Sequence, residues 1–97
     1  MAKTFNIGRL VVTKEVDAMM RRDRKFQDHV KYSINRYSIC DWGTSSEDDK
    51  KANDEAFENG GRIFASYGYD KSKHNKKIWI ITEADRRITT ILFPEDY

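Results

Sequence analysis

The sequence has few residues that cross-link or interrupt a fold. Among its 97 residues there is one cysteine, Cys40, and one proline, Pro94. A single cysteine excludes an intramolecular disulfide, a zinc ribbon and a CxxC redox pair, and it favours a reducing compartment. The amino-terminal residues lack the apolar stretch of a signal peptide, and no apolar run approaches the ~18 residues that a membrane span needs. We therefore expect a cytoplasmic protein that does not enter a membrane.

An excess of charge of one sign is also lacking, because 18 lysines and arginines balance 16 aspartates and glutamates to a net charge of +2. A balance so close to neutral does not by itself imply nucleic-acid binding. The distribution is uneven, however. Residues 21–36 include six basic and two acidic side chains, whereas residues 45–58 include six acidic and two basic ones. The sequence therefore predicts two segments of opposite charge.

Aromatic side chains are well represented, with five phenylalanines, five tyrosines and two tryptophans. Each brings ~150–250 Å² of burial, which is enough for one domain of this length to fold without disulfides. No linker, repeat or low-complexity tract divides the chain, so we expect residues 1–97 to form a single domain. Trp42 and Trp79 are expected to be structural anchors.

Residue spacing predicts a short strand and two helices in the first 40 residues. Residues 9–13 are rich in β-branched side chains, and Thr13 can cap a short helix over residues 14–20. Asp23 begins a second helix of about fifteen residues. Apolar side chains recur along that helix at every third or fourth position: Phe26, Val30, Ile34 and Tyr37.

The remaining residues complete an α+β fold. Ser45 and Ser46 are alternative caps for a third helix that runs to about Glu58, before two glycines. The spacing then changes to two, which predicts strands over residues 62–67, 77–82 and 87–93. We expect the last three strands to form an antiparallel meander, with the three helices on one face of the sheet.

The third helix is poor in apolar side chains and rich in carboxylates. A row of carboxylates can engage a basic groove on a protein that normally holds nucleic acid. The residues assigned to this docking surface are Glu47, Asp48, Asp49, Asp54, Glu55 and Glu58. Ordinary solvation of a charged helix is the alternative explanation.

Basic side chains favour a different interpretation, a small regulator that binds nucleic acid directly through phosphate contacts. They are Arg21, Arg22, Arg24, Lys25 and Lys31 near the second helix, with Lys71, Lys73, Lys76 and Lys77 in the first hairpin loop. Stacking on bases could come from Tyr32, Tyr37, Tyr67 and Tyr69. A solvated helix face explains the same charges.

Catalytic and metal-binding motifs are missing, and we expect no enzymatic activity, metal or cofactor. His29 and His74 lack a second ligand at a recurrent metal-binding spacing. Glu83, Asp85 and Arg86 could give a small ribonuclease its general base and phosphate clamp. A turn cross-linked by its own ion pairs accounts for these three residues equally well.

Several strings resemble a known family of proteins. They are Asp41-Trp42-Gly43, Glu47-Asp48 with Asn53-Asp54, Gly61-Arg62, residues 78–86 and residues 89–97. From about Phe5 to Tyr97 the chain is similar to a family of small plasmid-related proteins carried on bacterial plasmids and conjugative elements. It departs from the family's His-Ala-Arg-Gly-like pattern at residues 37–40, where it reads Tyr-Ser-Ile-Cys.

The resemblance implies a mobile-element accessory protein without enzymatic activity. Small proteins of mobile elements frequently counter host defences, and anti-CRISPR proteins among them are of this size, act in the cytosol and work by binding. The expected partner is then a host defence protein such as a CRISPR effector nuclease.

Overall fold

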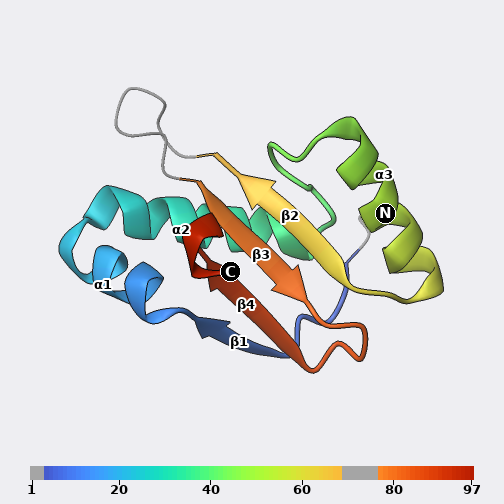
Figure 1. Ribbon diagram of the computed structural model, residues 1–97, viewed down its shortest axis with the longest axis horizontal. Coiled ribbons are helices and arrows are strands. Elements are labelled where there is room, and N and C mark those ends of the chain that lie inside the picture. Colours follow the sequence, from blue (N-terminus) through green and yellow to red (C-terminus); the bar gives the residue numbers. More distant parts are fainter. Residues whose placement is uncertain (1–3, 69–76) are drawn as a thin grey trace.

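The computed structural model describes residues 4–68 and 77–97, which form three α-helices and one four-stranded sheet (Figure 1). In chain order the elements are β1 (Arg9–Val12), α1 (Lys14–Arg22), α2 (Arg24–Ser38), α3 (Glu47–Asn59), β2 (Ile63–Tyr67), β3 (Ile78–Thr82), β4 (Ile88–Leu92) and the 3-10 turn η1 (Pro94–Asp96). The predicted α+β class and the predicted order of elements are confirmed.

The sheet is mixed, with the strand order β1-β4-β3-β2. β2, β3 and β4 form the expected antiparallel meander. β1 instead runs parallel to β4, with Arg9 opposite Ile88 and Val12 opposite Ile91. The expectation of an antiparallel sheet is therefore wrong for β1. The place of β1 beside β4 follows because α3 and the segment before it occupy the outer edge of β2, which leaves β4 as the free edge.

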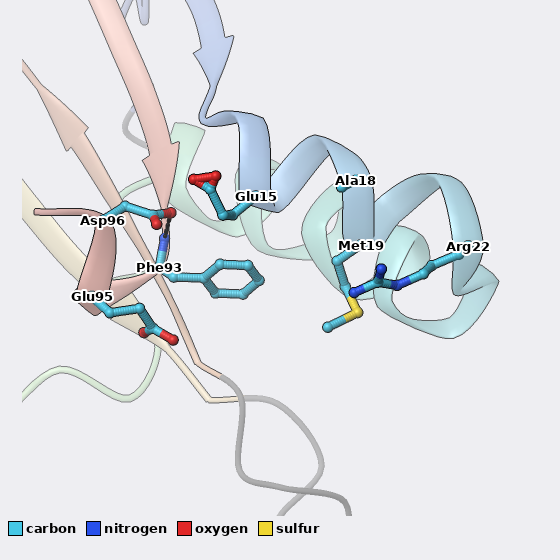
Figure 2. Close-up of a pocket in the computed structure, with 7 residues that line it drawn as sticks. All are labelled: Glu15, Ala18, Met19, Arg22, Phe93, Glu95 and Asp96. Atoms are coloured by element: carbon cyan, nitrogen blue, oxygen red, sulfur yellow. Dashed lines mark hydrogen bonds between the residues drawn. The ribbon is translucent and has the colours of Figure 1, made fainter.

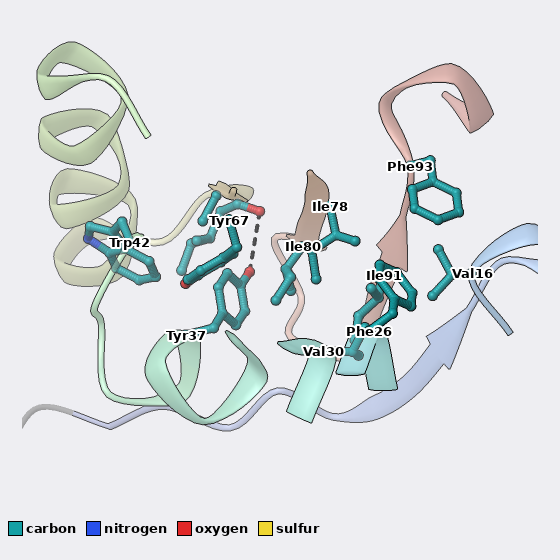
Figure 3. Packing of buried hydrophobic residues seen from close by; sticks show 12 residues of the cluster. Val16, Phe26, Val30, Tyr37, Trp42, Tyr67, Ile78, Ile80, Ile91 and Phe93 are labelled. Carbon is teal, nitrogen blue, oxygen red and sulfur yellow. Dashed lines mark hydrogen bonds between the residues drawn. The ribbon is translucent and has the colours of Figure 1, made fainter. Parts of the chain in front are cut away.

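The hydrophobic core lies between α2 and one face of the sheet (Figure 3). Because strand side chains alternate between faces, every second residue of β2, β3 and β4 points into it. The core residues are Val16, Phe26, Val30, Tyr37, Trp42, Ile63, Ala65, Tyr67, Ile78, Ile80, Ile91 and Phe93. The predicted apolar stripe of α2 supplies three of them, whereas Ile34 is only partly buried against the cluster.

The prediction that all three helices lie on one face needs correction for α3. Figure 1 shows α2 behind the sheet, and α3 beside the outer edge of β2. α1 packs mainly on α2. The helix starts agree with the sequence, since the side chains of Thr13, Asp23 and Ser46 each accept a hydrogen bond from the backbone N–H three residues later.

The second face of the sheet holds a small aromatic group instead of a helix. The ring of Trp79 lies 4.8 Å from that of Phe64 and 5.8 Å from that of Tyr97, measured between centroids. Ile81 and Leu92 are buried on this face. Trp79 is thus half-buried outside the main core, whereas Trp42 is buried within it.

Candidate functional site: the acidic helix and its attachment

α3 is attached to the sheet by a side-chain amide. Asn53 is the one buried residue of this helix. Its Nδ2 donates to the carbonyl oxygen of Phe64 at 2.7 Å, and its Oδ1 accepts from the N–H of Phe64 at 3.0 Å. The amide therefore replaces a neighbouring strand at the outer edge of β2. This attachment explains why α3 needs so few apolar side chains, and a partner is not required to account for them.

The segment before α3 closes more of the same edge. The N–H of Thr44 donates to the carbonyl oxygen of Ser66 at 2.8 Å, and Ser45 Oγ accepts from the N–H of Ser66 at 2.9 Å. Thr44 Oγ1 accepts from the N–H of Gly68 at 2.9 Å. Of the two predicted caps, Ser46 thus caps the helix while Ser45 bonds to the strand.

Trp42 forms a hydrogen bond with one of the six carboxylates of α3. Its indole Nε1 donates to Asp54 Oδ1 at 2.8 Å. The indole ring is buried against Phe5 and Tyr37, so its N–H depends on a protein acceptor. Asp54 is therefore a structural residue first, although its side chain remains exposed on one side.

Arg86 holds the carboxyl-terminal end of α3. Its guanidinium donates to the carbonyl oxygens of Ala56 and Gly61, from Nη2 at 3.0 Å and from Nη1 at 2.5 Å. The carbonyl of Ala56 is one that the helix end leaves without an intrahelical partner, and Gly61 follows the cap residue of the helix. Arg86 also adopts a φ of 63°, in the left-handed region. The residue considered above as a phosphate clamp thus has a defined structural role.

The other charged side chains of the turn between β3 and β4 also form polar contacts. Glu83 lies 3.7 Å from the guanidinium of Arg62, and Asp85 Oδ1 accepts from the N–H of Arg87 at 2.9 Å. The turn is therefore cross-linked by its own polar contacts. Arg86 contacts the end of α3, Glu83 contacts Arg62 and Asp85 contacts Arg87, so a structural explanation accounts for all three residues.

The outward side of α3 remains acidic. All six carboxylates are exposed. At 100° per residue, Asp48, Glu55 and Glu58 fall on the side of the helix opposite Asn53. Glu47 pairs with Lys50 at 3.3 Å. Within residues 4–68 and 77–97, Asp48, Asp49 and Glu55 form no ion pair. The exposed Lys51 lies on the same outward side, three residues after Asp48 and four before Glu55, and offsets part of their charge.

The repulsion among these carboxylates is partly offset at the amino-terminal end of α3. Glu47, Asp48 and Asp49 all lie in the first turn of α3. The N–H groups there are equivalent to about half a positive charge, and each nearby carboxylate gains ~0.3–1 kcal/mol. The fold therefore tolerates the acidic cluster without an external cation.

The basic residues gather at the other end of the molecule. Arg21, Arg22, Arg24 and Lys25 are exposed around the junction of α1 and α2, far from α3 (Figure 1). Arg21 pairs with Asp17 at 2.9 Å. The basic residues 21–25 and the acidic helix therefore lie as two poles at opposite ends of a molecule about 38 Å long, whereas Arg36, at the other end of α2, pairs with Asp41.

The remaining residues assigned to nucleic-acid binding differ in their exposure. Lys31 and Lys77 are exposed, while Lys71, Lys73, Lys76, His74 and Tyr69 lie outside the described residues. Tyr37 and Tyr67 are buried, so their rings cannot stack on bases, and burial raises the pKa of both hydroxyls. Tyr32 is exposed and lies beside the guanidinium of Arg36.

A pocket of about 330 Å³ lies between α1 and the carboxyl-terminal turn η1 (Figure 2). Its walls come from two parts of the chain that are far apart in sequence, so no local pattern of residues predicts it. Its lining residues are Glu15, Ala18, Met19, Arg22, Phe93, Glu95 and Asp96. Asp96 already accepts hydrogen bonds from Thr13 Oγ1 at 2.8 Å and from the N–H of Phe93 at 3.1 Å. The pocket mixes charges of both signs and points to no single ligand class.

The part of the chain that the structure describes holds no group of three or more histidine, cysteine, aspartate or glutamate side chains suited to a metal ion. His29 is half-buried beside Phe26, and this burial lowers its pKa. None of the described helices is both long enough and apolar enough to cross a membrane.

Comparisons of the chain with protein-family models, with curated proteins and with solved structures gave no match. The resemblance to plasmid-related proteins therefore rests on the sequence strings quoted above.

Proposed function

We propose that this chain is a mobile-element accessory protein that inhibits a host defence nuclease, such as a CRISPR effector, by binding the surface that the nuclease uses for nucleic acid. The observation that supports this proposal is the acidic outward side of α3. Asp48, Glu55 and Glu58 stand on a helix that Asn53 and Arg86 hold to the sheet. No catalytic step is involved.

The physical basis is competition between carboxylates and phosphates for the same cations. From Asp48 to Glu58 the helix rises by about 15 Å, at 1.5 Å per residue, so its charges can meet several lysines or arginines of a groove. A helix already fixed in place loses little conformational freedom on binding. Such charge contacts speed association and select the partner, and salt weakens them.

The test reverses charge on the outward side of α3 without touching its attachment. The variant carries Asp48→Lys and Glu55→Lys. Asp54 is left alone, because reversing it would break the bond to Trp42 and confound binding with folding. The matched control carries Glu15→Lys and Asp28→Lys, which change net charge equally at exposed positions elsewhere.

The partner is first isolated from the native host, and its DNA binding and cleavage are then measured with each variant. We expect the α3 variant to weaken inhibition at least about tenfold, or about 1.4 kcal/mol, while the control stays within about twofold. Each variant reverses one carboxylate in the first turn of a helix, Asp48 in α3 or Glu15 in α1, so both should melt slightly and about equally below the wild type. Unchanged inhibition by the α3 variant would reject this surface.

A second candidate function is a nucleic-acid-binding regulator. The observation in its favour is the distance between the poles, since the acidic helix does not face the cations at the α1–α2 junction (Figure 1). Retention on DNA at ~50 mM salt that is lost with Arg24→Glu and Lys25→Glu would support it. Passage of the wild type through the same column would exclude it, because phosphate contacts are strongest at low salt.

A further inference from the structure

The two edges of the sheet differ in whether their outward backbone groups have hydrogen-bond partners. At β2, the side chains of Asn53, Thr44 and Ser45 and the backbone of Thr44 occupy the outward backbone groups. At β1, the other edge, β4 is the only strand neighbour among the described residues. An open edge presents donors and acceptors to another chain, and proteins generally protect such edges.

The hydrogen bonds of β1 show which of its groups face outward. The N–H of Arg9 donates to the carbonyl oxygen of Arg87 at 2.8 Å, and the N–H of Thr13 donates to that of Ile91 at 3.0 Å. In a parallel ladder only alternate residues bond to a given neighbour. Leu10 and Val12 therefore direct their N–H and C=O groups away from β4. Within residues 4–68 and 77–97 these groups have no hydrogen-bond partner.

The side chains along this edge are apolar and basic. Leu10 is 44% exposed, which is high for a leucine beside a core. Arg9, Lys14 and Arg87 are exposed around it. The strand contains no proline, and no helix among residues 4–68 and 77–97 makes extensive contact with it, so its short length and Arg9 are the protective features that the described residues provide.

We propose that the edge of β1 accepts an additional strand from a partner protein, namely an extended segment in which acidic and apolar side chains alternate. Its backbone would pair with the outward groups of Leu10 and Val12. Its apolar side chains would lie beside those two residues on the core face, and its acidic side chains beside Arg9 on the other face.

The charges decide between a partner protein and a second copy of this chain. Two copies paired through β1 would bring Arg9 and Lys14 of one copy close to the same cations of the other, which costs energy. An acidic strand gains from the same cations. This surface lies at the opposite sheet edge from α3, so the inference stands apart from the proposed inhibition.

The test uses the full chain labelled with ¹⁵N and a blocked eight-residue peptide of alternating glutamate and valine. We expect saturable amide shifts centred on Leu10 and Val12, with slower hydrogen exchange at both. The same peptide with N-methylated backbone amides on its pairing edge should bind at least about tenfold more weakly, because it lacks the donors. An equal affinity for the methylated peptide would overturn strand addition.

Variants at Leu10 and Arg9 distinguish the contribution of backbone hydrogen bonds to peptide binding from that of charge. Leu10→Pro removes an outward N–H without breaking a bond to β4, so it should abolish peptide binding, whereas Leu10→Ala should retain most of it. Arg9→Glu should shift preference to a peptide of alternating lysine and valine, which keeps the test informative if Leu10→Pro fails to fold.

Three results would overturn the proposal: shifts spread over α3, no saturable change at β1 up to about 1 mM peptide, or a wild-type dimer that Leu10→Pro dissociates. The last result would assign the edge to a second copy. The Asp48→Lys and Glu55→Lys variant should bind the peptide normally, so the two proposals can fail separately.

Discussion

The hydroxyl oxygen of Tyr37 lies 2.7 Å from Thr82 Oγ1, which joins the carboxyl-terminal end of α2 to β3 in the core. Thr82 Oγ1 lies 2.6 Å from Thr89 Oγ1, which in turn donates to the carbonyl oxygen of Ile7 at 2.6 Å. A carbonyl can only accept, so the single hydrogen of Thr89 is committed to Ile7. Thr82 must then donate to Thr89, and Tyr37 to Thr82. The buried hydroxyls form a chain with one direction.

Removing the first member of this chain should destabilise the fold. Tyr37→Phe leaves the Thr82 oxygen without its donor in a buried site, and we expect a loss of about 1–2 kcal/mol in the free energy of unfolding. Urea denaturation measures it. Tyr32→Phe is the matched control, because that hydroxyl is exposed, and it should change stability by less than about 0.5 kcal/mol. Equal effects of the two variants would contradict the ordered chain.

Asn53 should contribute more to stability than any other polar residue of α3. Asn53→Ala leaves the N–H and C=O of Phe64 without partners at a part-buried edge, with an expected loss of about 2–4 kcal/mol. Asn59→Ala, at the exposed end of the same helix, should cost less than about 0.5 kcal/mol. Thermal unfolding compares the two. Since Asn53→Ala also opens the β2 edge, it should aggregate at lower concentration than the wild type.

Arg86 and Arg87 are adjacent but should differ in effect. Arg86→Ala removes the donors to Ala56 and Gly61, and we expect a loss of about 1–3 kcal/mol. Arg87 is 83% exposed at its side chain, so Arg87→Ala should be nearly neutral. Denaturation curves measure both. An RNA cleavage assay run in parallel should show no activity that Glu83→Gln abolishes, and such an activity would restore the ribonuclease interpretation.

The ion pair of Arg36 and Asp41 should make stability depend on pH at the acidic end. Arg36 donates to both carboxylate oxygens of Asp41, at 2.8 and 3.1 Å, and this contact lowers the pKa of Asp41 below its usual value. The unfolded pKa is about 3.9. The contribution is therefore present above about pH 4 and is lost as pH falls through the lower folded pKa.

Asp41→Asn should lower stability at pH 7 by about 1 kcal/mol or less, because both side chains are partly exposed. The difference from the wild type should shrink as the acid limit is approached, as measured by urea denaturation at several pH values. Asn35→Ala, which changes no titratable group at an exposed position of α2, should show no such trend. A difference that grows with acid would contradict the assigned direction.

The helices, the strands and their order along the chain can be predicted from local residue patterns. Thr13, Asp23 and Ser46 start their helices because a cap acts on a backbone N–H only three residues away. The strands follow from a spacing of two, and the opposite charges of the two poles can be counted directly from the residues. These features depend on neighbours along the chain, which the sequence shows.

Which charged side chains contact the rest of the fold depends on how the elements pack together. Asp48 and Asp54 are the same residue type on one helix, and Arg86 and Arg87 are adjacent arginines. Asp54 differs from Asp48 because it accepts a hydrogen bond from Trp42, and Arg86 differs from Arg87 because it donates to the end of α3. The parallel pairing of β1 with β4 and the hydrogen bonds at the outer edge of β2 likewise join residues that are far apart in sequence. Long-range contacts form between residues far apart in sequence, so no local pattern encodes which partner each side chain meets.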